Sequence, residues 1–265
     1  MSGQTRVETT DGYGILTLAR PDIRNALTGA EMLAELVTFF RSPPTGVVVV
    51  TGEGPAFSAG GNVKDMAEKE GIFAGTPAEI TEGYRRTIQE LTRAVYSTDA
   101  VTIAAVNGPA VGAGFDLVLG CDLRIGSSKA WFAHTFSELG IIPGDGGAWL
   151  LPRAVGWQRA TELALTARRV YAAEAVDLDI LLEVTEPEAL LDRARALAEE
   201  IAAKPPHSVR LTKRLLRLSR TTDLEAFLEL SAALQAVSHA EPDHDAAVAR
   251  YLARLTRRAR VSGSD

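Results

Sequence analysis

Cysteine is nearly absent from this sequence. Cys121 is the single cysteine among 265 residues, which excludes an internal disulfide and a cysteine-rich metal site. No histidine lies near Cys121 in the sequence, so we expect a buried core thiol in a reducing compartment and not a nucleophile. We also expect no bound metal.

Long apolar runs and an excess of positive charge are missing too. No stretch approaches the roughly 18 consecutive apolar residues of a membrane helix, and the N-terminus MSGQTRVETTDG lacks the apolar core of a signal peptide. The net charge of −6 disfavours nucleic acid as a main partner, because phosphate backbones bind basic surfaces. We therefore expect a cytoplasmic protein that binds neither membrane nor nucleic acid.

The residues that are present predict an α/β protein with a sizeable core. Hydrophobic residues make up 46% of the chain and charged residues 23%, which is ordinary for a globular protein. The runs VVVVTG at 47–52 and VTIAAV at 101–106 are short and apolar, which is typical of buried parallel strands. From roughly residue 146 onward, alanine, leucine, arginine and glutamate predict a mostly helical chain.

Local signals predict further elements. Thr28, followed by Glu31 three residues later, predicts a helix that begins with a capping box. A helix is expected over 79–97 and a short apolar helix from about Ala113. Asp122, after Cys121, is expected to anchor backbone at the start of a strand.

Each of the two buried strands leads into a glycine-rich turn. These turns read GPAFSAGGNVK at 54–64 and NGPAVGAGFD at 107–116. Glycine permits sharp and left-handed turns, and the first turn of a helix exposes unpaired N–H groups. Two such groups that converge on one point form an oxyanion hole, worth about 3–4 kcal/mol per donor. Taken alone, either turn could equally be a tight connection without a ligand. Neither matches a phosphate-binding motif.

The sequence resembles the crotonase superfamily, the enoyl-CoA hydratase/isomerase fold. The resemblance implies a spiral of repeated ββα units over 1–195 that holds an acyl-CoA site. It also implies a helical segment over 196–265 that packs between subunits of a homotrimer or a dimer of trimers. Coenzyme A enters as part of the substrate, with no separate cofactor. The matching stretches are ARPDIRNALT at 19–28, FSAGGNVKDM at 57–66, IAAVNGPAVGAGFDLVLGCDLRIGS at 103–127, LGIIPGDGGAWLLPRAVG at 139–156 and KPPHSVRLTKRLLR at 204–217.

The resemblance also assigns binding residues by position. The oxyanion hole falls on the backbone N–H groups of Gly61 and Ala113. Alanine at position 113 is compatible with this role, because the side chain is not the donor. The implied CoA-binding set comprises Arg24, Asn25, Ala26, Ala59 and Lys64. For Lys64 the alternative is a solvated surface lysine that binds no ligand.

The catalytic side chains depart from the family pattern. Hydratases of this family use two glutamates to hold and activate one water. Asp116 stands at the first position and Phe136 at the second, and Phe136 cannot exchange a proton. Glu138 and Asp145 are acidic neighbours that could compensate.

Each of these acids has a structural alternative. Asp116 could stabilise a helix dipole, and Asp145 could cap a helix that begins at Gly146. Glu138 could be a surface residue. His134 lies on the same segment and titrates near neutral pH, although a packed or hydrogen-bonded role is favoured.

We therefore predict an enzyme that stabilises an enolate-like transition state on an acyl-CoA thioester. Hydration of a 2-enoyl-CoA is the usual assignment for such sequences. Double-bond isomerisation by Asp116, Asp145 or both fits the residues more closely. A third reading is a CoA-ester-binding protein without hydratase activity, because Phe136 replaces the second glutamate.

Overall fold

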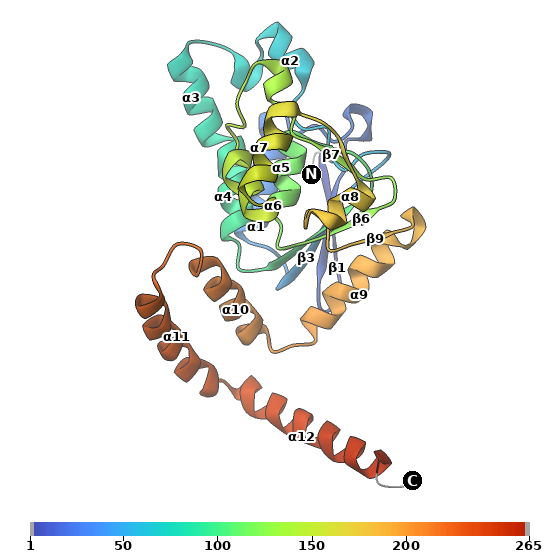
Figure 1. Ribbon diagram of the computed structural model, residues 1–265, viewed down its shortest axis with the longest axis vertical. Coiled ribbons are helices and arrows are strands. Elements are labelled where there is room, and N and C mark those ends of the chain that lie inside the picture. Colours follow the sequence, from blue (N-terminus) through green and yellow to red (C-terminus); the bar gives the residue numbers. More distant parts are fainter. Residues whose placement is uncertain (1–2, 263–265) are drawn as a thin grey trace. The chain divides into compact units, whose positions relative to one another are not determined.

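The computed structural model describes residues 3–262, with side chains through Thr256. The chain divides into two compact units at Glu199–Glu200. Among the described residues every strand belongs to the first unit, and the second is built from helices (Figure 1). No helix within residues 3–262 is both long enough and apolar enough to cross a membrane.

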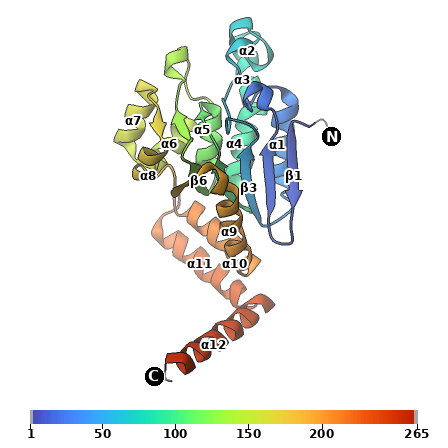
Figure 2. The same ribbon diagram turned by 90° about the vertical axis from the view of Figure 1, so that its right-hand side faces the viewer.

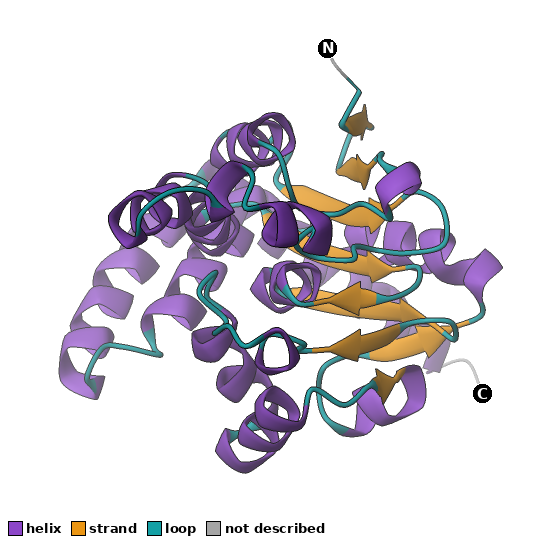
Figure 3. Ribbon diagram, turned by 90° about the horizontal axis from the view of Figure 1, so that it is seen from above, coloured by secondary structure: helices purple, strands orange, loops and turns teal. Residues whose placement is uncertain are grey.

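A six-stranded sheet in the order β1-β2-β3-β4-β6-β9 forms the centre of the first unit (Figure 3). β1 and β2 are antiparallel, and every later pair of neighbours is parallel. β3 and β4 are the two predicted apolar runs, and both are buried almost throughout. The prediction of buried parallel strands is therefore confirmed. The strands are β1 (Thr5–Thr9), β2 (Gly14–Leu18), β3 (Val47–Gly52), β4 (Val101–Val106), β6 (Leu123–Ser127) and β9 (Glu183–Thr185).

Helices of the first unit pack beside this sheet (Figures 1 and 2). Val48 and Val50 of β3 share one core with Leu36 of α1 and Leu91 of α4. From α1 the contacts run in sequence through α4, α5 and α6 to α7, so the start of α5 lies within a continuous helical layer. These helices are α1 (Ala30–Arg41), α4 (Ile88–Ser97), α5 (Ala113–Gly120), α6 (Gly147–Val155) and α7 (Trp157–Thr166).

The remaining elements complete both units. A small sheet pairs β5 with β7 in parallel and β7 with β8 antiparallel, so the predicted helical region after residue 146 also contains the short strands β8 and β9. These elements are α2 (Val63–Glu68), α3 (Pro77–Arg86), β5 (Ala110–Val111), β7 (Trp131–Ala133), β8 (Val170–Tyr171), α8 (Ala172–Asp177), α9 (Leu190–Ala202), α10 (Pro206–Leu218), α11 (Leu224–His239) and α12 (Pro242–Ser262).

The predicted capping box at Thr28 and Glu31 is wrong. α1 follows Gly29, whose φ of 81° no β-branched residue readily adopts, and no side chain caps this helix. A capping box does form at the start of α3, between Thr76 and Glu79.

The predicted single helix over 79–97 is also wrong. The chain breaks at Thr87, whose φ of −122° and ψ of −95° are not helical, so α3 and α4 are separate. This break follows from tertiary packing, because α4 buries an apolar face while α3 buries none of its residues.

The start of β6 is tied to β4 by Asp122. Its Oδ2 accepts hydrogen bonds from Thr102 N–H at 2.8 Å and from Thr102 Oγ1 at 2.9 Å. Thr102 Oγ1 in turn accepts from Asp122 N–H at 3.0 Å. The predicted anchoring role of Asp122 is confirmed, and Cys121 beside it is buried as predicted.

Replacing Asp122 with alanine removes the acceptor of both Thr102 groups. We expect Asp122→Ala to lower the free energy of unfolding by about 1–2 kcal/mol, measured by urea denaturation. Asp122→Asn retains a carbonyl acceptor and should lose less than half as much. Equal losses in the two variants would contradict the hydrogen-bond explanation.

Candidate active site

The two glycine-rich turns lie side by side at one edge of the large sheet. They follow β3 and β4, whose carboxyl ends meet because the strands are parallel neighbours. A bridge pairs Ser58 of the first turn with Ala110 of the second. Val111 N–H donates to the Ser58 carbonyl at 3.0 Å. The turns therefore form one rigid backbone unit.

Glycine is required where the turns touch. Gly60 has a φ of 78°, and a Cβ on it would lie 2.3 Å from the Val111 carbonyl oxygen and 3.1 Å from Ala113 N. The Gly61 N–H, which follows directly, therefore lies on backbone that adjoins Ala113. Within the part of the chain that the structure describes, neither the Gly61 N–H nor the Ala113 N–H donates a hydrogen bond to the protein.

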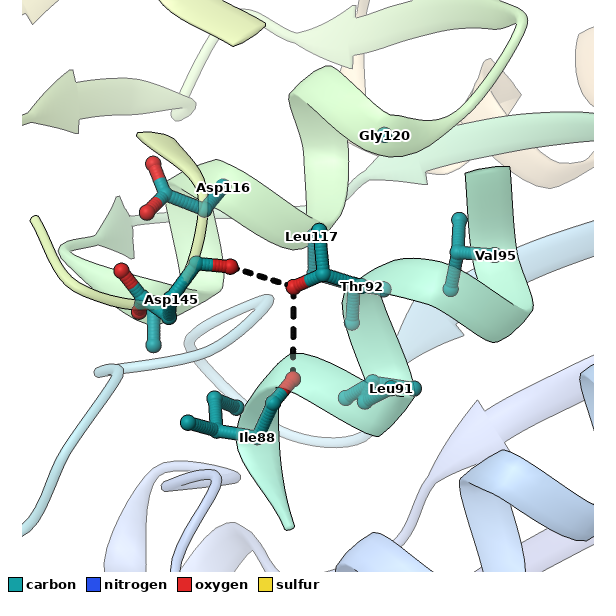
Figure 4. Close-up of a pocket in the computed structure, with 9 residues that line it drawn as sticks. Ile88, Leu91, Thr92, Val95, Asp116, Leu117, Gly120 and Asp145 are labelled. Carbon is teal, nitrogen blue, oxygen red and sulfur yellow. Dashed lines mark hydrogen bonds between the residues drawn. The ribbon is translucent and has the colours of Figure 1, made fainter. Parts of the chain in front are cut away.

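Asp116 and Asp145 lie together next to this backbone unit (Figure 4). Asp116 stands three residues after Ala113, on the same face of α5, and Asp145 comes from the turn before α6. Both residues are only 4% exposed. Asp116 Oδ2 and Asp145 Oδ1 find no donor among the described residues, and both carboxyls line the same small cavity.

A small cavity adjoins the carboxyl pair and has room for about one water molecule. Ala113 lines it together with both aspartates, and the rest of its wall comes mainly from apolar side chains of α4 and α5 (Figure 4). The lining residues are Ile88, Leu91, Thr92, Val95, Ala113, Asp116, Leu117, Gly120 and Asp145.

Burial controls the charge of the pair. It raises the pKa of Asp116 to about 7, although hydrogen bonds from Asp145 and from the Gly147 N–H oppose the rise. Burial and the neighbouring charge of Asp116 together raise the pKa of Asp145 well above its ordinary value. Two carboxylates in contact cannot both ionise cheaply, so the pair retains one shared proton near neutral pH.

Side chains of α4 hold the turn that carries Asp145. Gln89 Nε2 donates to the Gly144 carbonyl at 2.8 Å, and Thr92 Oγ1 donates to the Asp145 carbonyl. α6 begins after Gly146 without a side-chain cap, so Asp145 does not cap the helix. These bonds fix the backbone of the turn against α4. The Asp145 side-chain carboxyl therefore faces Asp116.

Gly147 completes the carboxyl site. An ideal Cβ at this position would lie 2.3 Å from Asp116 Oδ1 and 2.4 Å from Oδ2. Only glycine therefore lets the first turn of α6 approach Asp116 this closely. The sequence motif contained this glycine, but its role depends on a contact between α5 and α6.

His134 adjoins the pair and is packed and hydrogen-bonded, as predicted. Its Nε2 lies 3.2 Å from Asp116 Oδ1, and the residue is 1% exposed. Phe136 stands beside it, with the two ring centroids 4.7 Å apart. The Phe136 ring also lies 3.7 Å from where a Cβ on Gly112 would be. The position of the expected second glutamate is thus apolar, and a histidine and a second aspartate contact Asp116 instead.

The predicted CoA-binding residues near the N-terminus adjoin the first turn. The Ala59 N–H donates to the Arg24 carbonyl at 2.9 Å, and the Arg24 side chain is exposed. Asn25 and Ala26 are buried. The Asn25 amide donates to the carbonyls of Glu53 and Ala56, each at 2.9 Å, so its side chain serves the fold.

Two predicted site residues lie apart from the carboxyl pair. Lys64 is exposed on the first turn of α2, and Glu138 is exposed on a 3-10 turn over Ser137–Leu139. Neither lines the cavity beside Asp116. In the described chain, residues 3–262, no group of three His, Cys, Asp or Glu side chains is arranged to hold a metal.

The raised pKa of Asp116 makes stability depend on pH. Between the unfolded pKa of 3.8 and the folded pKa of about 7, the folded state binds more protons, so the free energy of unfolding falls as pH rises. Asp116→Asn removes this penalty. We expect its Tm at pH 8 to exceed that of the unmodified protein by roughly 5 °C, and the gain to vanish near pH 4.

The matched control for this experiment is Glu138→Gln, which removes an exposed carboxylate. It should leave the difference in Tm between pH 4 and pH 8 unchanged. A Tm for Asp116→Asn that falls below the unmodified protein at pH 8 would contradict the buried-charge explanation.

Comparison with known proteins extends the similarity over nearly the whole chain. The family model described as enoyl-CoA hydratase/isomerase matches residues 8–258. A Rhodobacter capsulatus protein named a probable enoyl-CoA hydratase is 36% identical over 202 residues, which are 76% of this chain and 76% of that protein.

Solved structures share the fold. An enoyl-CoA hydratase from Bacillus anthracis is 30% identical, with a TM-score of 0.86 over 95% of this chain and 96% of its own. A Thermobifida fusca YX protein solved in complex with acetoacetyl-CoA is 34% identical, with a TM-score of 0.82 over 90% of this chain and 95% of its own. The predicted α/β fold class is confirmed.

Proposed function

Because the chain belongs to the enoyl-CoA hydratase/isomerase family, we propose that it hydrates a 2-enoyl-CoA thioester with Asp116 and Asp145 as the proton-transfer pair. The observation that carries this proposal is the buried carboxyl pair, in which Asp116 lies on the same face of α5 as Ala113 and Asp145 comes from the turn before α6. A solved relative that holds acetoacetyl-CoA supports a CoA thioester as the ligand.

The thioester carbonyl oxygen accepts hydrogen bonds from the Gly61 and Ala113 N–H groups. These donors lie on rigid backbone and need no reorganisation when negative charge builds on the oxygen. Each is worth about 3–4 kcal/mol of transition-state stabilisation in a developed site. Arg24 and Lys64 are both exposed near the first turn, and we assign them to the CoA phosphates. Arg24, Asn25, Ala26 and Ala59 supply the backbone surface beside the thioester.

Hydration uses the two aspartates in complementary roles. Ionised Asp116 takes a proton from water as the water oxygen bonds to the β-carbon, and the π electrons move toward the α-carbon and the carbonyl oxygen. Protonated Asp145 then gives its proton to the α-carbon. The proton now on Asp116 returns to Asp145 through their mutual hydrogen bond, so one water is added and the pair is restored. Glu138 takes no part in these steps, because it is exposed on another turn.

Double-bond isomerisation is a second candidate, favoured by Phe136. A phenyl ring at the position of the second glutamate cannot hold the attacking water. In this reaction one aspartate removes the α-proton of a 3-enoyl-CoA and returns it to the γ-carbon of the dienolate.

We also propose that the chain assembles as a homotrimer or a dimer of trimers. The helices of the second unit support this, because they expose a series of large apolar side chains. These are Leu216, Leu224, Leu228, Val237, Val248, Tyr251, Leu252 and Leu255. Surfaces of this kind commonly serve as interfaces.

One assay separates the possible activities. Crotonyl-CoA and a 3-enoyl-CoA are each incubated with the protein while absorbance of the conjugated thioester is followed. We expect loss of absorbance with the first substrate, and a rate that rises as Asp116 ionises near pH 7. Asp116→Asn should reduce kcat about 10²–10⁴-fold while binding is retained.

Other results of this assay would change the assignment. A gain of absorbance with the 3-enoyl-CoA alone would make the enzyme an isomerase. Binding of both thioesters without turnover would make the protein a CoA-ester binder and overturn the enzymatic proposal. Unchanged turnover in Asp116→Asn would remove this residue from the mechanism.

Gly147→Ala tests the approach of α6 to the carboxyl pair. The new Cβ would push Asp116 from its place, and a displacement of about 1 Å in a reacting group costs on the order of 10²-fold in rate. We expect kcat to fall by that amount. Gly46→Ala is the control, since nothing lies within 4 Å of a Cβ there, and it should retain full activity. A Gly147→Ala variant that folds and turns over normally would contradict the proposed arrangement.

A further inference from the structure

The proposed reaction leaves one buried titratable side chain without a role. His134 follows β7, which pairs with β5 through Val111 and Ala133. The Gly112 N–H donates to the Ala133 carbonyl at 2.9 Å, so the backbone beside His134 is joined to the start of α5. This connection holds the imidazole against Asp116.

The imidazole is held in one orientation. Its Nε2 lies 3.2 Å from Asp116 Oδ1. The rings of Phe136 and Phe115 lie edge-on to it, with centroids 4.7 and 6.3 Å away. In the chain that the structure describes, the buried Nδ1 has no hydrogen-bond partner. An ionised carboxylate only accepts, so the contact with ionised Asp116 requires the Nε2–H tautomer.

We propose that neutral His134 donates its Nε2–H to Asp116 and so makes Asp116 the ionised member, and Asp145 the protonated member, of the carboxyl pair. The inference rests on the proposed function, because it decides which aspartate is the base and which is the acid. His134 is a positioning residue, since its unpartnered Nδ1 gives a proton no exit.

The charges around the imidazole agree with this assignment. The titratable groups that face it are Asp116 from α5 and Asp145 from the turn before α6. Tyr84 of α3 lies on the far side of this turn, near Gly144, and burial and the charge of Asp145 raise its pKa. Burial lowers the pKa of His134 to about 4, against the pull of Asp145. The ring is therefore neutral over the pH range in which the aspartates share their proton.

A hydrogen bond to the ionised form of a carboxyl lowers its pKa. His134 lies against one oxygen of Asp116, whereas among the described residues the ionised Asp145 carboxyl accepts a hydrogen bond only from its own backbone N–H, so the two carboxyls become unequal. Loss of a hydrogen bond to a charged group corresponds to about one to two pKa units. Without His134, the proton would be distributed more evenly over the pair, and Asp116 would be a poorer base below neutral pH.

The test requires no substrate. The aspartate side-chain carboxyls are labelled with ¹³C and titrated by NMR in the unmodified protein, in His134→Leu and in His134→Gln, with Asp116→Asn and Asp145→Asn used for assignment. We expect the lower of the two macroscopic pKa values to rise by about one to two units in His134→Leu. His134→Gln should restore it, because the glutamine amide can donate in the same place. A folded His134→Leu with both values unchanged would overturn the proposal.

Two further measurements keep the test decisive. If His134→Leu does not fold, ¹⁵N NMR of the imidazole in the unmodified protein must show the neutral Nε2–H tautomer. An Nδ1–H tautomer or a charged ring would overturn the proposal. In the enoyl-CoA assay the acid limb of kcat should move to higher pH in His134→Leu, with KM unchanged. Absence of turnover in the unmodified protein would reject the proposed function and leave the titration as an independent result.

Discussion

The site depends on the parallel pairing of β3 with β4. Parallel neighbours end at the same edge of a sheet, so the two glycine-rich turns that follow them must share one place. Ser58 and Ala110 continue the pairing beyond the strands, which allows the turns to touch. Glycine at position 60 permits this approach, because a Cβ there would lie 2.3 Å from the Val111 carbonyl oxygen, and Ala113 of the second turn lines the small cavity.

Burial of the two aspartates has a cost that the rest of the fold offsets. A carboxylate taken out of water loses solvation, and a second one beside it adds repulsion. The large sheet, buried on both faces at β3 and β4, and the helices packed against it supply the stability that allows this. In return the pair holds a proton near neutral pH, which is what acid–base chemistry on a thioester requires.

The chain differs from the two-glutamate pattern in where its second carboxyl comes from. Position 136 is occupied by a phenylalanine whose ring lies near Gly112, and Asp145 reaches Asp116 from the start of α6 instead. A shorter acid at position 116 suits this arrangement, because Gly147 brings backbone close to its carboxyl. His134 contacts Oδ1 of Asp116. The three polar side chains form one buried cluster drawn from three segments of the chain.

Local patterns in the sequence were sufficient for the buried strands β3 and β4 and for the glycine-rich turns that follow them. A run such as VVVVTG has one structural meaning when it is short, β-branched and closed by glycine. Predictions that depended on competing local signals failed. The capping box at Thr28 does not form, because Gly29 precedes α1 with a positive φ. The single helix over 79–97 is broken at Thr87, where the packing of α4 interrupts it.

Tertiary structure decided which acids meet. In the sequence, Glu138 and Asp145 are both acidic neighbours of position 136. In the structure, Gln89 and Thr92 of the distant α4 hold the backbone at Asp145 so that this residue is buried. Glu138 is exposed. The contact between His134 and Asp116 likewise follows from the pairing of β5 with β7. Such contacts join residues far apart in the chain, and their pKa values depend on burial, which exists only once the core has formed.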